Sequence, residues 1–263
     1  DKTLPSISSI TPSWGSYLNA TEDNSDGTIT VVTNGIEDGQ TLTIGLNSRT
    51  YTGSISSNSV SITIPAARLQ ELVNGTTYTI TANVSDNAGN PSSQASTTFI
   101  YDITATINSI SLSWGTHLNA TEDNNDGTVT VSTTGIDNGQ TLTLGLNSKT
   151  YTGSISSNSV SITIPADDLQ ELNEGTHTIT ADATDLADNA ASQASTTFIY
   201  DKTLPSIDSV SFSWGSVLNS TEDNSNGIIT VNTSGIEDGQ TVTIVLNGHS
   251  YSNTINSLSL IHI

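Results

Sequence analysis

Residues 50–66 read TYTGSISSNSVSITIPA, and residues 150–166 repeat this stretch without a change. Within it, the apolar residues Val60, Ile62 and Ile64 alternate with serine and threonine. Such alternation is typical of a strand that buries one face and exposes the other. The stretch therefore predicts two strands, at about 49–56 and 59–65, in each copy.

The duplication extends over the whole chain with a period of one hundred residues. Trp14, Trp114 and Trp214 fall at this interval, inside SWGSYLNATEDNSDG, SWGTHLNATEDNNDG and SWGSVLNSTEDNSNG. This period is too long for a solenoid unit and matches a small domain. We therefore predict three repeats, at 1–102, 103–201 and 202–263, of which the third is truncated. Its tail, SLSLIHI at 257–263, departs from the SNSVSITI expected there.

Each repeat has the pattern of an all-β domain. Alternating runs separated by turn signals such as Asp26-Gly27, Asn34-Gly35 and Asn74-Gly75 predict about seven strands. In the first repeat they are expected at 6–12, 28–34, 40–47, 49–56, 59–65, 76–85 and 93–101. Only residues 66–72 suggest a helical turn, after a proline. Seven short strands in a domain of this size predict tandem immunoglobulin-like (Ig-like) β-sandwiches, without the cysteines of antibody domains.

Charge and composition exclude several classes of partner. The chain has 26 acidic and five basic residues and a formal net charge of −21. Such a chain would repel phosphate backbones and anionic membrane surfaces, so we expect no nucleic-acid partner. Its apolar runs are far shorter than the ~20 residues needed to span a bilayer, so we also expect no membrane insertion. It contains no cysteine, so disulfides do not hold its domains. DKTLPSI at 1–7 recurs at 201–207, which suggests a segment of a longer array whose export signal lies outside it.

Strand alternation predicts which loops share an end of a sandwich. We call the end where the chain enters a repeat its entry pole and the opposite end its exit pole. The loops NGIEDGQ (34–40) and DNAGN (86–90) are expected at the entry pole. The loop TEDNSDG (21–27) and the dipeptide Tyr101-Asp102 are expected at the exit pole. Acidic residues of consecutive repeats should therefore meet at each junction.

The predicted meeting points are rich in oxygen and lack cysteine and paired histidine, which suits a hard cation such as calcium. The candidate ligands at the first junction are Glu22, Asn24, Asp26, Asp102, Asp137, Asp185 and Asp188. Those at the second junction are Glu122, Asn124, Asp126, Asp201 and Asp238. The alternative interpretation stays open: the same residues could form ordinary turns in which acids provide solubility.

Several phrases of the repeat resemble a known family. YDKTLPSI (200–207) resembles V-D-T-T-A-P linkers, SDNAGN (85–90) resembles a D-x-A-G-N loop, and LNATE (18–22) and NSRTYTGSI (47–55) also match. In order and spacing they resemble the bacterial Ig-like repeats of very large, type I-secreted, repeats-in-toxin adhesins. The resemblance implies calcium at the junctions and a location at the bacterial surface or outside the cell. The second repeat departs from the pattern, with YDITATI (101–107) lacking proline and TDLADN (184–189) lacking glycine.

No pattern indicates catalysis. There is no Gly-x-Ser-x-Gly motif, and Glu71 and Glu171 have no second acid at a fixed spacing. The four histidines do not recur between repeats. We therefore expect a non-enzymatic extender region of a bacterial surface adhesin. In this interpretation, neighbouring repeats and calcium are its partners, and a distal region binds the ligand for adhesion or biofilm formation. Two alternatives remain: a carbohydrate- or protein-binding module, and accessory domains of a secreted polysaccharide-degrading enzyme.

Overall fold

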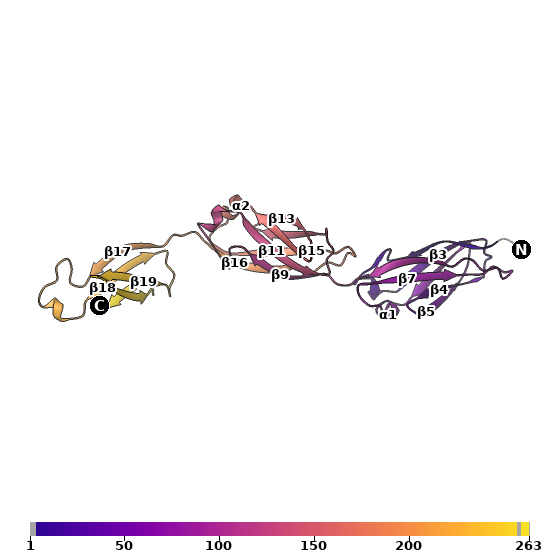
Figure 1. Ribbon diagram of the computed structural model, residues 1–263, viewed down its shortest axis with the longest axis horizontal. Helices are drawn as coiled ribbons and strands as arrows, with labels where there is room; N and C mark the ends of the chain where they lie inside the picture. The colour runs from indigo at the N-terminus through magenta and orange to yellow at the C-terminus, as the bar shows by residue number, and fades with distance from the viewer. Residues whose placement is uncertain (1–3, 257–258, 263) are drawn as a thin grey trace. The chain divides into compact units, whose positions relative to one another are not determined.

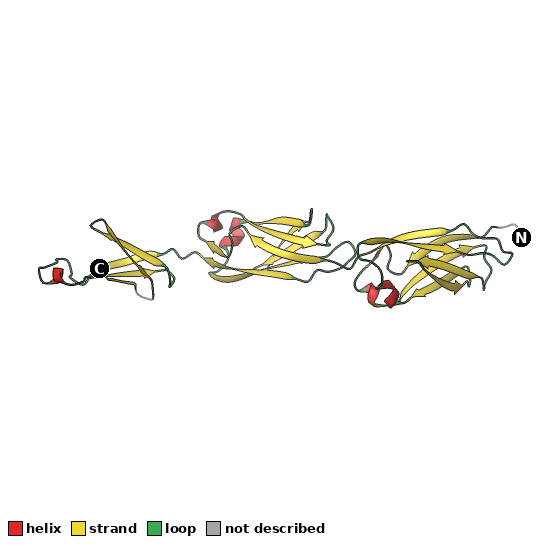
Figure 2. Cartoon of the chain, turned by 60° about the horizontal axis from the view of Figure 1, so that its bottom comes forward, coloured by secondary structure: helices red, strands yellow, loops and turns green. Residues whose placement is uncertain are grey.

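The structure is a computed structural model that describes residues 4–256 and 259–262. Strands dominate it, with only short helical segments between them (Figures 1 and 2). All seven strands predicted for the first repeat are present, and the all-β, Ig-like fold class is confirmed. Among the described residues, no helix has the length and apolarity to cross a bilayer.

The first repeat contains β1 (Ser6–Pro12), β2 (Tyr17–Leu18), η1 (Glu22–Asn24), β3 (Gly27–Asn34), β4 (Thr41–Leu46), β5 (Arg49–Ser54), β6 (Ser59–Ile64), α1 (Ala66–Leu69), β7 (Thr76–Asn83) and β8 (Ala95–Tyr101). One sheet has the order β1-β3-β6 and the other β2-β8-β7-β4-β5. All pairings are antiparallel except that of β2 with β8. The chain thus joins one sheet through β1 and the other through β2.

The second repeat contains β9 (Thr106–Leu112), β10 (His117–Asn119), η2 (Glu122–Asn124), β11 (Gly127–Thr134), β12 (Thr141–Leu146), β13 (Lys149–Ser154), β14 (Ser159–Ile164), α2 (Ala166–Gln170), β15 (Gly175–Ala183) and β16 (Ala194–Asp201). Its sheets have the orders β14-β11-β9 and β10-β16-β15-β12-β13. The topology is therefore that of the first repeat.

The third repeat contains β17 (Ser206–Phe212), η3 (Glu222–Asn224), β18 (Ile228–Ser234), β19 (Thr241–Leu246), β20 (His249–Thr254) and β21 (Ser259–His262). Its tail shows a changed register. Val31 pairs with Val60 in the first repeat, whereas the corresponding Val231 pairs with Ser259. Strand β21 is thus shifted by one residue. The remaining tail residues, 257–258 and 263, lie outside the described residues.

The chain divides into two compact units. The first comprises Asp1–Gly115, Asp126–Pro165 and His177–Thr197, and the second comprises Thr116–Asn125, Ala166–Thr176 and Phe198–Ile263. The first junction between repeats lies within the first unit. The linker at 201–205 and the loops around it lie within the second unit.

Trp14 and Trp114 of the repeated phrase lie in the cores of their repeats. Trp14 is 6% exposed and packs edge-on against Phe99, with ring centroids 5.2 Å apart. A Cβ added to Gly27 would collide with the ring of Trp14. The glycine that ends the TED loop therefore makes room for the tryptophan. This packing fixes where β3 begins relative to the exit pole.

Two elements of the exit pole do not follow from the alternation. The strand β2 is too short to show a period, and η1 turns the TED segment into a 3-10 helix. The predicted helix at 66–72 is shorter, at Ala66–Leu69, because Leu72 already bonds to the carbonyl of Leu69 in a tighter turn.

Candidate functional site: the junction between repeats

At the exit pole of the first repeat, the polar side chains form hydrogen bonds mostly with other groups of the same pole. Glu22 Oε2 accepts a hydrogen bond from Asn19 N at 3.1 Å. Asn24 donates to Ala20 O at 2.6 Å, and Asp26 Oδ1 accepts from Ala66 N at 2.9 Å. Of these predicted metal ligands, Glu22 and Asn24 thus shape their own loop, and Asp26 binds the start of α1. Their spare oxygens remain, since a carboxylate offers about four acceptor positions.

The linker that follows the first repeat is fixed to that repeat. Asp102 N donates to Leu18 O at 3.0 Å, and Asp102 Oδ1 accepts from Thr104 N at 3.1 Å. Asn74 holds the next residues: its Oδ1 accepts from Ile103 N at 2.8 Å, and its Nδ2 donates to Thr104 Oγ1 at 2.6 Å. We call these two bonds between Asn74 and the linker the linker clamp.

The loop 185–189 forms the entry pole of the second repeat together with Asp137. Asp185 is 2% exposed, and its Oδ1 accepts from Ala187 N and Asn189 N, both at 2.8 Å. Asp137 Oδ2 accepts from Leu186 N at 3.0 Å. Asp188 adopts a φ of 65°, where the first repeat has Gly89 at 88°. Aspartate tolerates this left-handed conformation better than most residues, so the loop keeps its form without glycine.

Three hydrogen bonds join the first repeat and its linker to this loop. Asn19 Nδ2 donates to Ala187 O at 3.0 Å, and Ala20 N donates to Asn189 Oδ1 at 2.9 Å. Asn189 Nδ2 donates to Asp102 O at 2.8 Å. The TED segment, the linker aspartate and the entry-pole loop therefore meet within the first unit.

Three of the predicted acids lie near one another at this junction. Burial raises the pKa of Asp102 above its usual 3.8, and the charges of Asp185 and Asp137 raise it further, although a backbone bond from Thr104 opposes them. Asp102 and Asp137 also line one pocket of about 330 Å³. Its other lining residues are Gly135, Ile136, Asn138 and Asn158. The pocket therefore offers carboxylate and amide oxygens to a cation.

The described residues contain no group of three or more histidine, cysteine, aspartate or glutamate side chains arranged to hold a metal ion. The structure thus places Asp102, Asp137 and Asp185 close together but directs Glu22, Asn24 and Asp26 to bonds within their own pole. Asp188 serves mainly as a turn residue, through its left-handed backbone. As a set of metal ligands, these residues remain a prediction.

The residues that make the direct contacts were missed by the sequence reasoning. Asn19, Asn74 and Asn189 are not among the predicted metal ligands, because their contacts depend on which amides face each other in the folded chain. A signal was available for Asn189, because Asp86 and Asn90 of SDNAGN recur as Asp185 and Asn189 of TDLADN. An acid followed four residues later by asparagine is thus retained where the glycine is not.

Within the second unit, the linker at 201–205 repeats several of these bonds. Asp201 Oδ1 accepts from Thr203 N at 2.9 Å. Glu174 takes the place of Asn74 in the linker clamp, with its Oε1 accepting from Lys202 N at 3.2 Å and from Thr203 Oγ1 at 2.7 Å. The predicted ligands Glu122 and Asn124 again bond to Asn119 and Ala120 of their own loop.

A pocket of about 620 Å³ lies beside this linker. Glu122, Asp201 and Glu237 line it together with Lys202, whose ammonium also lies 5.6 Å from the centre of the Tyr200 ring. The first linker has Ile103 where the second has Lys202. The second pocket therefore contains a cation of the protein itself, whereas no lysine or arginine lines the first. Of the remaining predicted ligands, Asp126 directly precedes β11 and Asp238 lies in the turn before β19.

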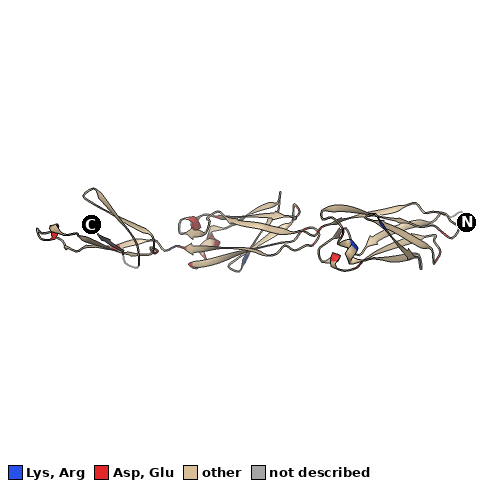
Figure 3. Ribbon diagram, turned by 90° about the horizontal axis from the view of Figure 1, so that it is seen from below, with Lys and Arg blue, Asp and Glu red and all other residues tan. Residues whose placement is uncertain are grey.

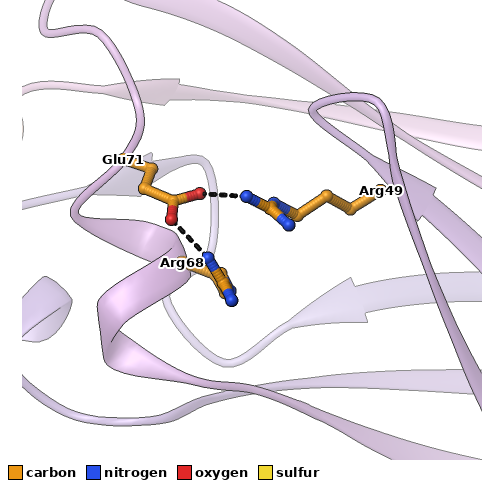
Figure 4. A network of polar contacts seen from close by, with 3 residues as sticks. All are labelled: Arg49, Arg68 and Glu71. Carbon is orange, nitrogen blue, oxygen red and sulfur yellow. Dashed lines mark hydrogen bonds and ion pairs between the residues drawn. The ribbon is translucent and has the colours of Figure 1, made fainter.

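Most acidic residues lie in loops, turns and short helices rather than along strands (Figure 3). Two of the five basic residues, Arg49 and Arg68, bind the same acid, Glu71, and both pairs are exposed (Figure 4). The bond from Arg68 is the main cause that lowers the pKa of Glu71. Both arginines are thus paired with an acid of the first repeat itself.

No protein-family model matches the sequence, and no curated protein matches it. Among solved structures, the chain is similar to a Ca²⁺-stabilized adhesin with which an Antarctic bacterium binds ice, at 22% identity and a TM-score of 0.47, covering 100% of this chain and 66% of that one. It therefore spans slightly less than two thirds of that structure.

Two further solved structures come from ice-binding adhesins. One belongs to a 1.5-MDa bacterial ice-binding adhesin, at 20% identity and a TM-score of 0.44, covering 100% of this chain and 88% of that one. The other is a bacterial immunoglobulin-like domain of the M. primoryensis ice-binding adhesin, at 26% identity and a TM-score of 0.29, covering 37% of this chain and 96% of that one.

Proposed function

We propose that this chain is a non-catalytic spacer from a bacterial surface adhesin, built of Ig-like repeats at 1–102, 103–201 and 202–263. Its role is to hold a distal ligand-binding region away from the cell. The sequence resemblance to adhesin repeats supports this role. Export by a signal outside the segment, and a place at the cell surface or outside the cell, belong to the same proposal.

The observation that carries the proposal is the contact between consecutive repeats. A flexible tether needs no hydrogen bonds between its domains, whereas here three bonds of 2.8–3.0 Å join the first repeat and its linker to the loop 185–189. The linker clamp adds two more bonds between Asn74 and the linker. A spacer gains reach when the angle between its domains is restricted, and these contacts restrict it.

The second part of the proposal is that calcium binds at the first junction, with Asp102 and Asp137 as ligands. These carboxylates line one pocket, and the pKa of Asp102 is raised first by burial and then by the charges of Asp185 and Asp137, which a cation would offset. Calcium takes six to eight oxygen ligands in flexible geometry, so amide, backbone and water oxygens would complete its shell. The bound ion would neutralise the acids and hold the two repeats together.

The test is a calcium titration of the whole chain. Calcium binds the native junction and not the unfolded chain, so millimolar calcium should raise the melting temperature, and a chelator should reverse the effect. Isothermal titration calorimetry should show the heat of calcium binding under the same conditions. The double variant Asp102→Asn with Asp137→Asn should lose most of both responses.

A matched control removes the same kind of charge elsewhere. Asp182 is an exposed residue of β15 that accepts hydrogen bonds from Gln193. Asp182→Asn should keep the full calcium response. The calcium part of the proposal is wrong if the wild-type chain shows no change in either measurement, or if the double variant responds as the wild type does.

A further inference from the structure

Asn189 has every hydrogen-bonding position of its side-chain nitrogen occupied. Its Nδ2 donates to Asp102 O and to Asp185 Oδ2, both at 2.8 Å, and its Oδ1 accepts from Ala20 N. One planar amide thus contacts the first repeat, the linker and its own loop at once. We propose that Asn189 is a lock that fixes the angle between the first two repeats without any bound ion.

Asp185 positions the lock. Its two oxygens accept three bonds from its own loop, two of them from the backbone and side chain of Asn189. The carboxylate therefore orients the amide so that Nδ2 points to the linker and Oδ1 to Ala20. Because Asp185 is buried, these charge-assisted bonds are stronger than bonds between neutral groups in water.

The first repeat contains the equivalent loop at 86–90. Among the described residues, no other repeat packs on it. Asn90 N and Nδ2 both donate to Asp86 at 2.7 Å, so the acid and amide are arranged as in the second repeat. Asn90 is only half-buried and Ala88 is exposed, whereas Asn189 is 8% and Ala187 3% exposed. The loop geometry is therefore formed before contact, and docking buries it.

This lock differs from the calcium site in its chemistry and goes beyond the proposed function. Calcium would act on carboxylates, and its effect would vanish with a chelator. The bonds from Asn189 to Ala20 and Asp102 join neutral groups, so salt does not screen them as it screens exposed charges. The first junction should therefore stay ordered when no calcium is present.

The experiment measures the distance between the two repeats in the full chain. The chain has no cysteine, so Thr50→Cys and Thr150→Cys, both exposed and on the equivalent strands β5 and β13, give two unique sites for spin labels. Pulsed electron resonance then gives the distribution of label distances in excess chelator. A narrow distribution is expected for the parent protein, and Asn189→Ala should broaden it.

Asn90→Ala is the matched control, because it removes the same amide from the equivalent loop. It should leave the distribution narrow, and its melting temperature shows what the loop alone contributes to stability. Asn189→Asp is a second variant, since it keeps an acceptor for Ala20 N but loses the donor to Asp102 O. It should also broaden the distribution.

An unchanged narrow distribution in Asn189→Ala, with chelator present, would overturn the lock. A distribution in the parent protein that is as broad as in Asn189→Ala would overturn it equally. Adding calcium separates this inference from the calcium site. If calcium does not raise the melting temperature, the calcium site fails while the effect of Asn189→Ala on the distance distribution still stands.

Discussion

The phenol of Tyr101 donates a 2.6 Å hydrogen bond to Oδ2 of Asp23, and both residues are buried. Tyr101 is the last residue of β8, directly before the linker aspartate, and Asp23 lies in η1. In the second unit, Tyr200 makes the same 2.6 Å bond to Asp123. Each bond ties the TED segment to the strand that leads into the linker. The TED segment is thus fixed to the core of its own repeat by a buried hydrogen bond.

Removing the phenol oxygen should therefore destabilise the repeat. Tyr101→Phe leaves the buried Asp23 carboxylate without this donor, at an expected cost of about 1–3 kcal/mol in the free energy of unfolding. Urea denaturation followed by tryptophan fluorescence measures it, because Trp14 packs against Phe99 in the same core. Tyr51→Phe is the control, since no hydrogen bond is described for that hydroxyl. Equal effects of the two variants would contradict the assigned role of the bond.

The same bond predicts how Tyr200 titrates. Burial, and then the bond to Asp123 and its charge, raise the pKa of Tyr200 from 10.0 to about 12. Because the pKa is higher in the folded state, this group's contribution to stability is complete below pH 10 and is lost as pH rises towards about 12. The ultraviolet absorbance of tyrosinate should show a late phase that Tyr200→Phe removes. A titration that is unchanged by this variant would count against the buried bond.

The contribution of Asp102 to stability should change with pH in the opposite direction to that of a carboxylate with a cationic partner. Its pKa is raised above 3.8 in the folded chain. Protonation therefore favours the folded state, and the stabilisation is lost as pH rises through the folded pKa. In chelator at neutral pH, Asp102→Asn should raise the unfolding free energy by less than about 1 kcal/mol, because the group is partly exposed.

Thermal melts of wild type and Asp102→Asn at several pH values check this point. The difference between them should shrink as pH falls through the aspartate range, because wild-type Asp102 then becomes neutral as well. A variant that is less stable than the wild type in chelator would contradict the raised pKa of Asp102.

The sequence predicts the strands well because each half-buried strand carries its own alternation. It does not reveal β2 or η1, since segments of two or three residues have no period. The pole assignment also follows from the sequence, because each strand reverses the direction of the chain. The bond from Asn87 N to Glu37 at 2.9 Å places the loops 34–40 and 86–90 together, as predicted.

The site was predicted at the level of loops and not of side chains. Composition points to acids, yet several of them complete hydrogen bonds in their own pole, because the start of a helix or a turn needs acceptors for its N–H groups. Asp26 is an example, since it binds the first N–H of α1. The contacts between repeats use amides and backbone groups, and only the folded backbone shows which of these face each other.

The last prediction concerns how tightly the linker lies on the second repeat. Gly35 and Gly135 both have a φ of 72°. A Cβ on Gly35 would be 3.7 Å from Pro5 Cα, an ordinary contact, whereas a Cβ on Gly135 would collide with the carbonyl of Thr104. Both alanine variants should lose about 1 kcal/mol for the left-handed backbone. Gly135→Ala should lose clearly more and also displace the linker.

Two measurements separate these effects. Urea unfolding gives the stability loss of each variant, and the labelled Thr50→Cys, Thr150→Cys pair gives the distance between the repeats. Gly35→Ala should leave this distance unchanged, because Gly35 lies at the entry pole of the first repeat, away from the linker. Gly135→Ala should shift or broaden it, because Thr104 must move while Asn74 holds its hydroxyl at 2.6 Å. If both variants lose the same stability and keep the same distance, then Gly135 does not confine the linker.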